Sequence, residues 1–268
     1  MTHNPAGISS LIEKKGFISD MDGVIYHGNK LLSGAAEFVE WLTANDKKYL
    51  FLTNSSERSP QELRAKLLRL GIDVPKENFY TSALATADFL SRQHPNCSAF
   101  VIGEAGLTNA LYEKGISMND TNPDYVVVGE TRSYGYERIE KASLLVQRGA
   151  KLIGANPDLT GPSEKGIVPA TGSLIAPIEL TSNNKAYFVG KPNPLMMRRA
   201  VKTLGCHSAE TVIIGDRMDT DIIAGIEAEV DTVLVLSGVS DINTPKQFAY
   251  RPKHIFSGLA EMLEAIKA

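Results

Sequence analysis

The stretch FISDMDGVIYHG, residues 17–28, decides how the rest of the chain is interpreted. A short apolar run typical of a buried β-strand is followed at once by Asp20 and Asp22, and a glycine comes next. Because aspartate is disfavoured inside strands, we expect the strand to end near Ile18 and to deliver both carboxylates at its carboxyl end. Gly23 then allows the chain to turn before the apolar residues resume.

The composition is that of an ordinary globular protein with one large domain or two smaller ones. The 268 residues are 43% hydrophobic and 22% charged, and the net charge is −3. Because proteins that bind nucleic acids usually carry a basic stripe, we expect no nucleic-acid partner. The two cysteines form no CxxC pair, and no apolar run has the length of a signal peptide or a membrane span. We therefore expect a cytoplasmic protein without a membrane partner.

Short β-branched and apolar runs alternate with helical patterns along the chain. Leucines at helical spacing predict a helix over residues 60–70, and similar patterns predict helices over 134–148 and 194–204. The candidate strands are residues 16–18, 48–53, 99–102, 125–128, 152–154, 186–189, 211–214, 232–236 and 254–256. This alternation predicts an α/β protein with a parallel sheet covered by helices on both faces.

The middle of the chain differs from its two ends. Its strands end in Glu104, Glu130 and the sequence NPD at 156–158, without a hydroxyl, a lysine and paired aspartates. The stretch NPDLTGPSEKGIVPATGS, residues 156–173, is rich in glycine, proline and serine, which predicts a long ordered loop. We expect a discontinuous core domain of residues 1–83 and 186–268, and an inserted α/β domain of residues 84–185.

Polar side chains that suit phosphate chemistry follow the predicted strands of the core, at the edge where parallel sheets gather their functional groups. They are Asp20, Asp22, Thr53, Asn54, Lys191, Asp216 and Asp221. Neighbouring carboxylates repel one another unless a cation intervenes, and Mg²⁺ prefers oxygen ligands, including those of substrate phosphates. An aspartate can also attack phosphorus while a second carboxyl transfers a proton. The set predicts a site for a phosphate bridged to a metal.

Four motifs in this order resemble those of the haloacid dehalogenase (HAD) superfamily. They are DMDGV (residues 20–24), LTN (52–54), GKP (190–192) and GDRMDTD (215–221). Further similarity in YTSALATADFL, NPDYVVVGETRSY, GANPD and LVLSGVS extends over nearly the whole chain and resembles the NagD-like branch of phosphatases. The resemblance implies a Rossmann-like, doubly wound parallel-sheet core with an inserted α/β type 2 cap domain of the IIA group.

The resemblance also implies a role for each catalytic residue. Asp20 matches the family's nucleophile, which forms an aspartyl-phosphate, and Asp22 matches its general acid and base. Thr53 matches the hydroxyl that binds the phosphoryl group, and Lys191 matches the amine that orients nucleophile and phosphate. Taken alone, Thr53 would be an ordinary strand residue and Lys191 a surface lysine, but the order of the motifs favours the functional interpretation.

The metal implied by the resemblance is Mg²⁺. Its ligands would be the carboxylates of Asp20 and Asp216 and the backbone carbonyl of Asp22, which leaves the Asp22 carboxyl for proton transfer. Asp221 matches the second acid of the last motif, more often a supporting group than a direct ligand. Both Asp216 and Asp221 could instead cap the helix that follows.

Four further residues complete the candidate site. We expect Asn54 and Ser55 to bind the substrate phosphate through the loop after the second strand. Asn156 and Asp158 follow a strand of the inserted domain. They either face the substrate or shape a turn, for which Asn-Pro-Asp is suited.

The expected function is a Mg²⁺-dependent phosphomonoester hydrolase. The cap implies a small phosphate-ester substrate, such as a sugar phosphate or a nucleoside monophosphate, and an exposed apolar cap surface would indicate a homo-oligomer. One alternative is a phosphorylation switch, although receiver domains are shorter and lack an inserted domain. A second alternative is a non-catalytic phosphate-binding protein, which the intact set of motifs disfavours.

Overall fold

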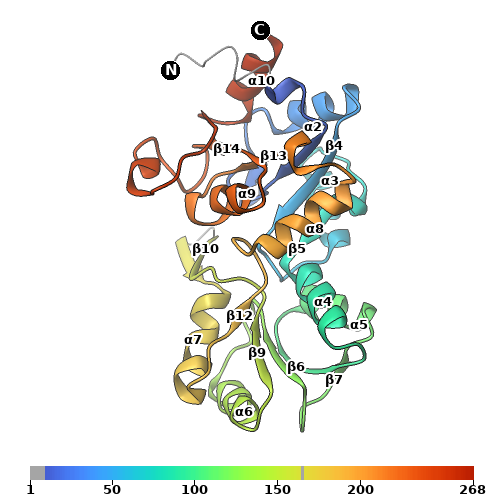
Figure 1. The fold of residues 1–268 in the computed structure, drawn as a ribbon, viewed down its shortest axis with the longest axis vertical. Coiled ribbons are helices and arrows are strands. Elements are labelled where there is room, and N and C mark those ends of the chain that lie inside the picture. Colours follow the sequence, from blue (N-terminus) through green and yellow to red (C-terminus); the bar gives the residue numbers. More distant parts are fainter. Residues whose placement is uncertain (1–9, 164–165) are drawn as a thin grey trace. The chain divides into compact units, whose positions relative to one another are not determined.

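The computed structural model describes residues 10–163 and 166–268 and divides into two compact units. Unit 1 comprises Met1–Thr53, Arg64–Tyr80 and Pro194–Ala268, and unit 2 comprises Asn54–Leu63 and Thr81–Asn193. Residues 1–9, part of the segment in which we expect no signal peptide, lie outside the described residues. Each unit is built around its own mostly parallel sheet (Figure 1).

Unit 1 is built on a six-stranded sheet. In spatial order its strands are β15 (His254–Phe256), β14 (Asp231–Val235), β13 (Thr211–Gly215), β1 (Gly16–Ser19), β4 (Lys48–Thr53) and β5 (Phe79–Thr81). β1 pairs in parallel with β13 and with β4, so that Ile18 lies between Ile213 and Leu50. The carboxyl ends of these three strands therefore lie at the same edge of the sheet, where α/β proteins place their ligands.

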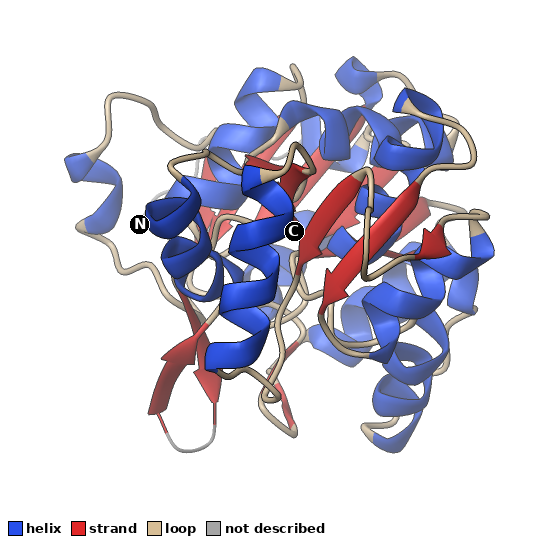
Figure 2. Ribbon diagram, turned by 90° about the horizontal axis from the view of Figure 1, so that it is seen from below, coloured by secondary structure: helices blue, strands red, loops and turns tan. Residues whose placement is uncertain are grey.

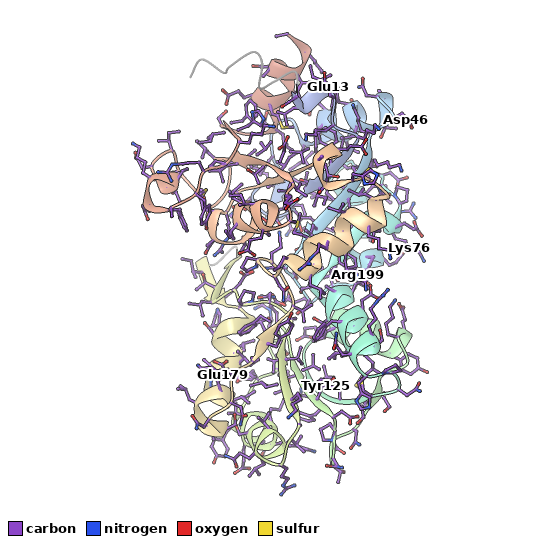
Figure 3. All side chains as sticks on the ribbon, in the orientation of Figure 1. Glu13, Asp46, Lys76, Tyr125, Glu179 and Arg199 are labelled. Atoms are coloured by element: carbon purple, nitrogen blue, oxygen red, sulfur yellow. The ribbon has the colours of Figure 1, made fainter. Side chains whose placement is uncertain are left out.

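Helices and short segments complete unit 1. Its helices are α2 (Ala35–Ala44), α3 (Pro60–Arg69, which begins in unit 2), α8 (Pro194–Leu204), α9 (Ile223–Glu227) and α10 (Leu259–Lys267). The short segments are β2 (Tyr26–His27), β3 (Lys30–Leu31), the π-helical turn η3 (Met218–Ile222), and the 3₁₀ turns η1 (Lys76–Asn78), η2 (Ser208–Glu210) and η4 (Thr244–Gln247). Charged side chains such as Glu13, Asp46 and Lys76 are exposed on the surface of this unit (Figure 3).

An aromatic group joins β1 to α2 in the core of unit 1. Phe17 on β1 and Phe38 on α2 are both almost fully buried, and their ring centroids lie 6.2 Å apart in an edge-on arrangement. Trp41, one turn further along α2, meets Phe17 edge-on at 5.5 Å. Each such pair contributes about 0.5–1.5 kcal/mol beyond the burial of apolar area. The strand that precedes Asp20 is therefore fixed by packing against α2.

Unit 2 has a second parallel sheet of five strands. In spatial order they are β12 (Tyr187–Phe188), β9 (Lys151–Gly154), β8 (Tyr125–Val128), β6 (Ser98–Ile102) and β7 (Ser117–Met118). Its helices are α4 (Ser82–Gln93), α5 (Ala105–Glu113), α6 (Tyr136–Gln147) and α7 (Thr171–Ser182). Val126 and Val128 of β8 pack with Leu145 of α6 and Ile175 of α7 in one apolar core. Figure 1 shows α4 and α5 on the other side of the strands from α7.

The prediction of a long loop over residues 156–173 was wrong. Thr160–Ser163 and Gly166–Pro169 pair as an antiparallel hairpin, β10 and β11 (Figure 2). α7 begins at Thr171. Glycine and proline are unfavourable in the interior of sheets but are tolerated in a two-stranded ribbon, where every strand is an edge. Composition alone therefore favoured a loop where the backbone forms a ladder.

The predicted fold class is confirmed, because in both units the strands of a parallel sheet alternate with helices along the chain. The functional division into a core of residues 1–83 and 186–268 and a cap of residues 84–185 stays a prediction. The compact units change over at Thr81 and after Asn193, and residues 54–63 belong to unit 2. None of the helices in the described part of the chain is long and apolar enough to cross a bilayer.

Gly34 is a position where only glycine fits. It precedes α2 with φ +84°, and a Cβ there would lie 2.3 Å from the backbone nitrogen of Ala260 at the start of α10. Gly71 has φ +95°, but a Cβ there would meet nothing within 4 Å, so it isolates the cost of the backbone conformation. We predict that Gly71→Ala destabilises by about 1 kcal/mol, and Gly34→Ala by about 1–3 kcal/mol more. Urea unfolding of the two variants measures this, and equal losses would contradict the predicted contact.

Asp231 links the start of β14 to two lysines. Its carboxylate lies 2.6 Å from the Lys14 ammonium and 2.7 Å from that of Lys253. Burial opposes ionisation, but the two lysine hydrogen bonds outweigh it and hold the pKa of Asp231 below its ordinary value. The stabilisation is therefore present above a pH of about 4 and is lost as the pH falls through the lowered pKa.

We predict that Asp231→Asn lowers the free energy of unfolding by about 1 kcal/mol at pH 7, and that this deficit shrinks in acid below about pH 4. Urea titrations at pH 7 and at acid pH provide the measurement. Glu40→Gln, on an exposed position of α2, is the control for loss of one negative charge. A deficit that is the same at every pH would contradict the ion-pair explanation.

Candidate active site

Asp20 stands directly after the last paired residue of β1. The strand ends at Ser19, one residue later than expected, and the Asp20 N–H still donates to the Ile214 carbonyl of β13 at 2.8 Å. The Ser19 hydroxyl donates to the Asp20 carbonyl, also at 2.8 Å. The backbone of Asp20 is thus fixed by the sheet on one side and by a local hydrogen bond on the other.

Asp216 follows β13, the neighbouring strand, and is 2% exposed. One of its carboxylate oxygens, Oδ2, accepts a hydrogen bond from the Val239 N–H at 2.7 Å. A Cβ at Gly23 would lie 2.5 Å from this oxygen, and a Cβ at Gly238 would lie 2.0 Å from it. Two glycines therefore make room for the Asp216 carboxylate, and Gly23 also needs its φ of +83° for the turn after Asp22.

Asp221 lies in the π-helical turn η3 and is 1% exposed. Its Oδ2 accepts from the Arg217 N–H at 3.1 Å, which is a capping bond of the kind considered for this residue. Its Cβ lies against the end of β13, because a Cβ at Gly215 would come within 2.2 Å of it. The Asp221 side chain therefore contacts both the start of its own turn and the end of β13.

The three aspartates form one acidic group. Asp20, Asp216 and Asp221 each offer a carboxylate oxygen, and these atoms all lie within 4.8 Å of one another. Two ionised carboxylates at that distance repel by about 3 kcal/mol at an effective dielectric constant of about 20. The group consists of oxygen donors from largely buried side chains, so its chemistry fits a hard divalent cation such as Mg²⁺.

Asp22 has a different environment and its side chain is not part of the acidic group. The Asp22 carboxylate lies 3.5 Å from Nδ1 of His27, and the backbone of Asp22 bridges to Tyr26. Burial raises the pKa of Asp22, and the nearby charges of Lys66 and His27 oppose this rise. Because its pKa is raised, Asp22 keeps its proton to a higher pH than an ordinary aspartate does. The Lys66 ammonium itself lies 3.4 Å from the centroid of the Tyr26 ring.

Thr53 and Ser55 flank the end of β4. Thr53 is the last residue of the strand and is 9% exposed. Ser55 is partly buried, and its hydroxyl oxygen accepts from the Glu57 N–H at 3.4 Å. Both residues stand at the carboxyl end of a strand next to β1, as the motif order requires.

Asn54 and Lys191 are joined inside unit 2. Oδ1 of Asn54 accepts from the Lys191 N–H at 2.8 Å, and Nδ2 donates to the Lys191 carbonyl at 2.9 Å. The same Nδ2 donates to Asp158 at 3.0 Å. Lys191 is 1% exposed, so it is not a surface lysine. The Asn54 side chain thus binds both the N–H and the carbonyl of Lys191.

Asn156 is fully buried beside Asn54. Its Nδ2 donates to the Asn54 carbonyl and to Glu130, both at 2.7 Å, and its Oδ1 accepts from the Asp158 N–H at 3.1 Å. The last bond is the turn-shaping bond expected for Asn-Pro-Asp. Asn156 and Asp158 therefore make hydrogen bonds within unit 2, and a contact with substrate stays a prediction.

Glu130 was not predicted as a site residue. Its carboxylate accepts from the Ser56 N–H at 2.9 Å, from the Ser56 hydroxyl and from Asn156. Burial raises the pKa of Glu130, against the effect of the hydrogen bonds from Ser56 and Asn156. The only signal in the sequence was its position directly after a predicted strand, which many loop residues share.

Seven of the ten predicted site residues thus fall into two groups, to which Asp22, Thr53 and Ser55 do not belong. In unit 1 the structure brings together Asp20, Asp216 and Asp221, and in unit 2 it brings together Asn54, Asn156, Asp158 and Lys191.

Comparisons with known proteins agree with this chemistry. A family model described as haloacid dehalogenase-like hydrolase matches residues 17–117, and a second HAD-like hydrolase model matches residues 188–262. The chain is 46% identical over 248 residues to the dihydroxyacetone phosphatase of Corynebacterium glutamicum (strain R), which covers 92% of this chain and 90% of the relative. It is 44% identical over 248 residues to the ribonucleotide monophosphatase NagD of Escherichia coli (strain K12), covering 92% and 98%.

Solved structures give the same result. NagD from E. coli K-12 matches with a TM-score of 0.88 over 92% of this chain and 98% of that one. The 4-nitrophenylphosphatase of Thermotoga maritima, 33% identical, matches with a TM-score of 0.92 over 96% and 99%. Proteins named as phosphatases therefore resemble this chain over most of its length. This similarity disfavours both alternatives, a phosphorylation switch and a non-catalytic phosphate-binding protein. The chain belongs to the haloacid dehalogenase-like hydrolases and is a phosphomonoester hydrolase of their NagD-like branch.

Proposed function

We propose that this enzyme hydrolyses small phosphorylated metabolites in a Mg²⁺-dependent reaction with Asp20 as the nucleophile. The observation that carries the proposal is the acidic group at the ends of β1 and β13, where oxygens of Asp20, Asp216 and Asp221 lie within 4.8 Å of one another. Such a group is costly unless a cation occupies it, and it stands at the edge of the sheet where this fold places its ligands.

The metal would be held by the carboxylates of Asp20 and Asp216 and by the backbone carbonyl of Asp22. Asp221 would support them, and its closeness to both carboxylates also suits direct ligation. When bound, Mg²⁺ would offset the negative charges of the carboxylates and the substrate phosphate.

The reaction then needs two steps from the aspartates. First, a carboxylate oxygen of Asp20 attacks phosphorus, the bond between phosphorus and the leaving oxygen breaks, and Asp22 gives that oxygen its proton. Second, Asp22 takes a proton from water, the water oxygen attacks phosphorus, and the bond to Asp20 breaks. The products are an alcohol and inorganic phosphate, and both side chains return to their starting states.

The environment of Asp22 supports its part in this scheme. Burial raises the pKa of its carboxyl, so more of it carries a proton at a given pH than in an ordinary aspartate. The Asp22 carboxyl must be protonated when substrate binds, so that it can act as the general acid. Once it has given up that proton, it can act as the general base toward water. Asp20, by contrast, acts only as an anion.

Phosphate binding is assigned to Thr53, Asn54, Ser55 and Lys191 on the strength of the motif resemblance. The burial of Lys191 and its attachment to Asn54 support the assignment, because a fixed backbone lets a lysine orient a phosphoryl group. Contacts of Asn156 and Asp158 with the substrate remain a prediction from the sequence.

The proposed substrates are sugar phosphates or nucleoside monophosphates. The names of the relatives, dihydroxyacetone phosphatase and ribonucleotide monophosphatase, support this range. A homo-oligomer formed through the cap and a cytoplasmic location remain predictions from the sequence.

We predict that Asp20→Asn lowers kcat with p-nitrophenyl phosphate by a factor of about 10³ or more, since an amide is a poor nucleophile. Phosphate release in the presence of Mg²⁺ is the assay. Asp46→Asn makes the same chemical change at an exposed position of unit 1 and should keep full activity. Undiminished turnover by folded Asp20→Asn protein would exclude Asp20 as the nucleophile.

We predict that EDTA abolishes activity and that added Mg²⁺ restores it. In wild-type protein Mg²⁺ should also raise the thermal midpoint, because a ligand that binds the folded state stabilises it. Asp216→Asn should need at least about tenfold more Mg²⁺ for both effects, a loss typical even when an outer partner of a metal ligand is removed. If EDTA-treated enzyme kept its rate and Mg²⁺ left the midpoint of wild-type protein unchanged, the metal site would be wrong.

A further inference from the structure

The carboxylate of Glu130 collects three donors from two distant parts of unit 2. Ser56 supplies its N–H at 2.9 Å and its hydroxyl to Oε2, and Asn156 supplies Nδ2 at 2.7 Å to Oε1. The Ser56 oxygen in turn accepts from the Glu130 N–H at 3.0 Å. Ser56 and Asn156 are both fully buried. Glu130 therefore joins the loop after β4 to the segment after β9.

The hydrogen bonds continue from Asn156 to Lys191. Nδ2 of Asn156 also donates to the Asn54 carbonyl at 2.7 Å, an oxygen that accepts from the Ser82 hydroxyl at 2.5 Å as well. The Asn54 side chain then holds the N–H and the carbonyl of Lys191. A continuous series of short hydrogen bonds thus runs from Glu130 through Asn156 and Asn54 to the backbone of Lys191.

The chemistry of these contacts suits a carboxylate. Its two oxygens accept from the Ser56 N–H, the Ser56 O–H and the Asn156 amide at once, which an ionised glutamate does without a proton of its own. Taking a charge out of water is unfavourable, and burial accordingly raises the pKa of Glu130. Three donors offset that cost, and the result is a rigid link between segments that are 74 and 26 residues apart from Glu130.

We propose that Glu130 is a positioning residue of the phosphatase reaction. Its carboxylate fixes the loop of residues 54–56 and, through Asn156 and Asn54, the backbone of Lys191. Glu130 thereby sets the affinity of the enzyme for the phosphoryl group without touching it. The inference rests on the proposed function, in which this loop and Lys191 bind the substrate phosphate.

Glu130→Gln tests the link with a change of one atom. A glutamine has one acceptor oxygen and one NH₂ group in place of two acceptor oxygens. If the NH₂ faces Asn156 it meets another NH₂, and if it faces Ser56 it meets an N–H, so one buried donor loses its partner in either orientation. A displacement of about 1 Å in a substrate-positioning group costs about 10²-fold. We expect kcat/KM for p-nitrophenyl phosphate to fall by about 10- to 100-fold.

Inorganic phosphate is the decisive probe. As a competitive inhibitor it reports on the phosphoryl site, and its inhibition constant does not depend on how much of the protein is folded. We expect this constant to rise by at least about tenfold in Glu130→Gln. Circular dichroism and the thermal midpoint establish folding. Glu113→Gln, which removes one exposed charge from α5 in the same unit, should match wild type in all measurements.

Ser56→Ala supplies a second test that keeps Glu130. It removes the hydroxyl donor and leaves the backbone donor, so it should shift the inhibition constant in the same direction by less. Combined with Glu130→Gln it should add little, because both changes break one link. This variant also decides the matter if Glu130→Gln fails to fold.

Two results would overturn the proposal. One is a folded Glu130→Gln protein whose kcat/KM and inhibition constant stay within twofold of wild type. The other, should Glu130→Gln not fold, is folded Ser56→Ala protein with unchanged constants. Asp20→Asn, assayed alongside, distinguishes a failure of the positioning role of Glu130 from a failure of the proposed function. If Asp20→Asn is inactive and the Glu130 variants behave like wild type, only the positioning role is wrong.

Discussion

The parallel pairing of β1 with β13 is the constraint on which the acidic group of this protein depends. The register that sets Ile18 opposite Ile213 also makes the two strands end together, so Asp20 and Asp216 emerge side by side. A shift of one residue would turn every side chain of β1 to the opposite face of the sheet. Phe17, held between Phe38 and Trp41, opposes such a shift, because it would leave the aromatic core. Packing of Phe17 against α2 thus helps to determine where the carboxylates lie.

The fold was predictable from the sequence where a strand is rich in β-branched or aromatic residues. β4, β8 and β15 have the bounds expected from the sequence alone, and α8 begins at its proline as expected. β10 and β11 were missed, because a ribbon with edges on both sides tolerates the glycines and prolines that break larger sheets. The start of α7 was hidden inside the same stretch, and this helix also contains Pro177, a residue that argues against helix interiors.

The members of the candidate site were predictable because each follows a strand and belongs to a motif with a recognisable order. What could not be predicted is how they are held. The room that Gly23 and Gly238 leave for Asp216 depends on residues more than two hundred positions apart. The position of Glu130 after a predicted strand did not distinguish it from other loop residues, since its contacts are with Ser56 and Asn156, which no local pattern connects to it. A sequence indicates chemistry through residue type, whereas support for that chemistry comes from contacts that only folding creates.

The Asn54 hydrogen bonds have a consequence for how such an enzyme diversifies. Ser82 and Lys191 stand near the two ends of the longer segment of unit 2, Thr81–Asn193, and both are bonded to Asn54. The entrance and the exit of this segment are therefore neighbours. A piece of chain whose ends meet can be lengthened, exchanged or replaced by recombination without separating the strands to which it is attached. Asn54 thus holds together the two ends of this segment of unit 2.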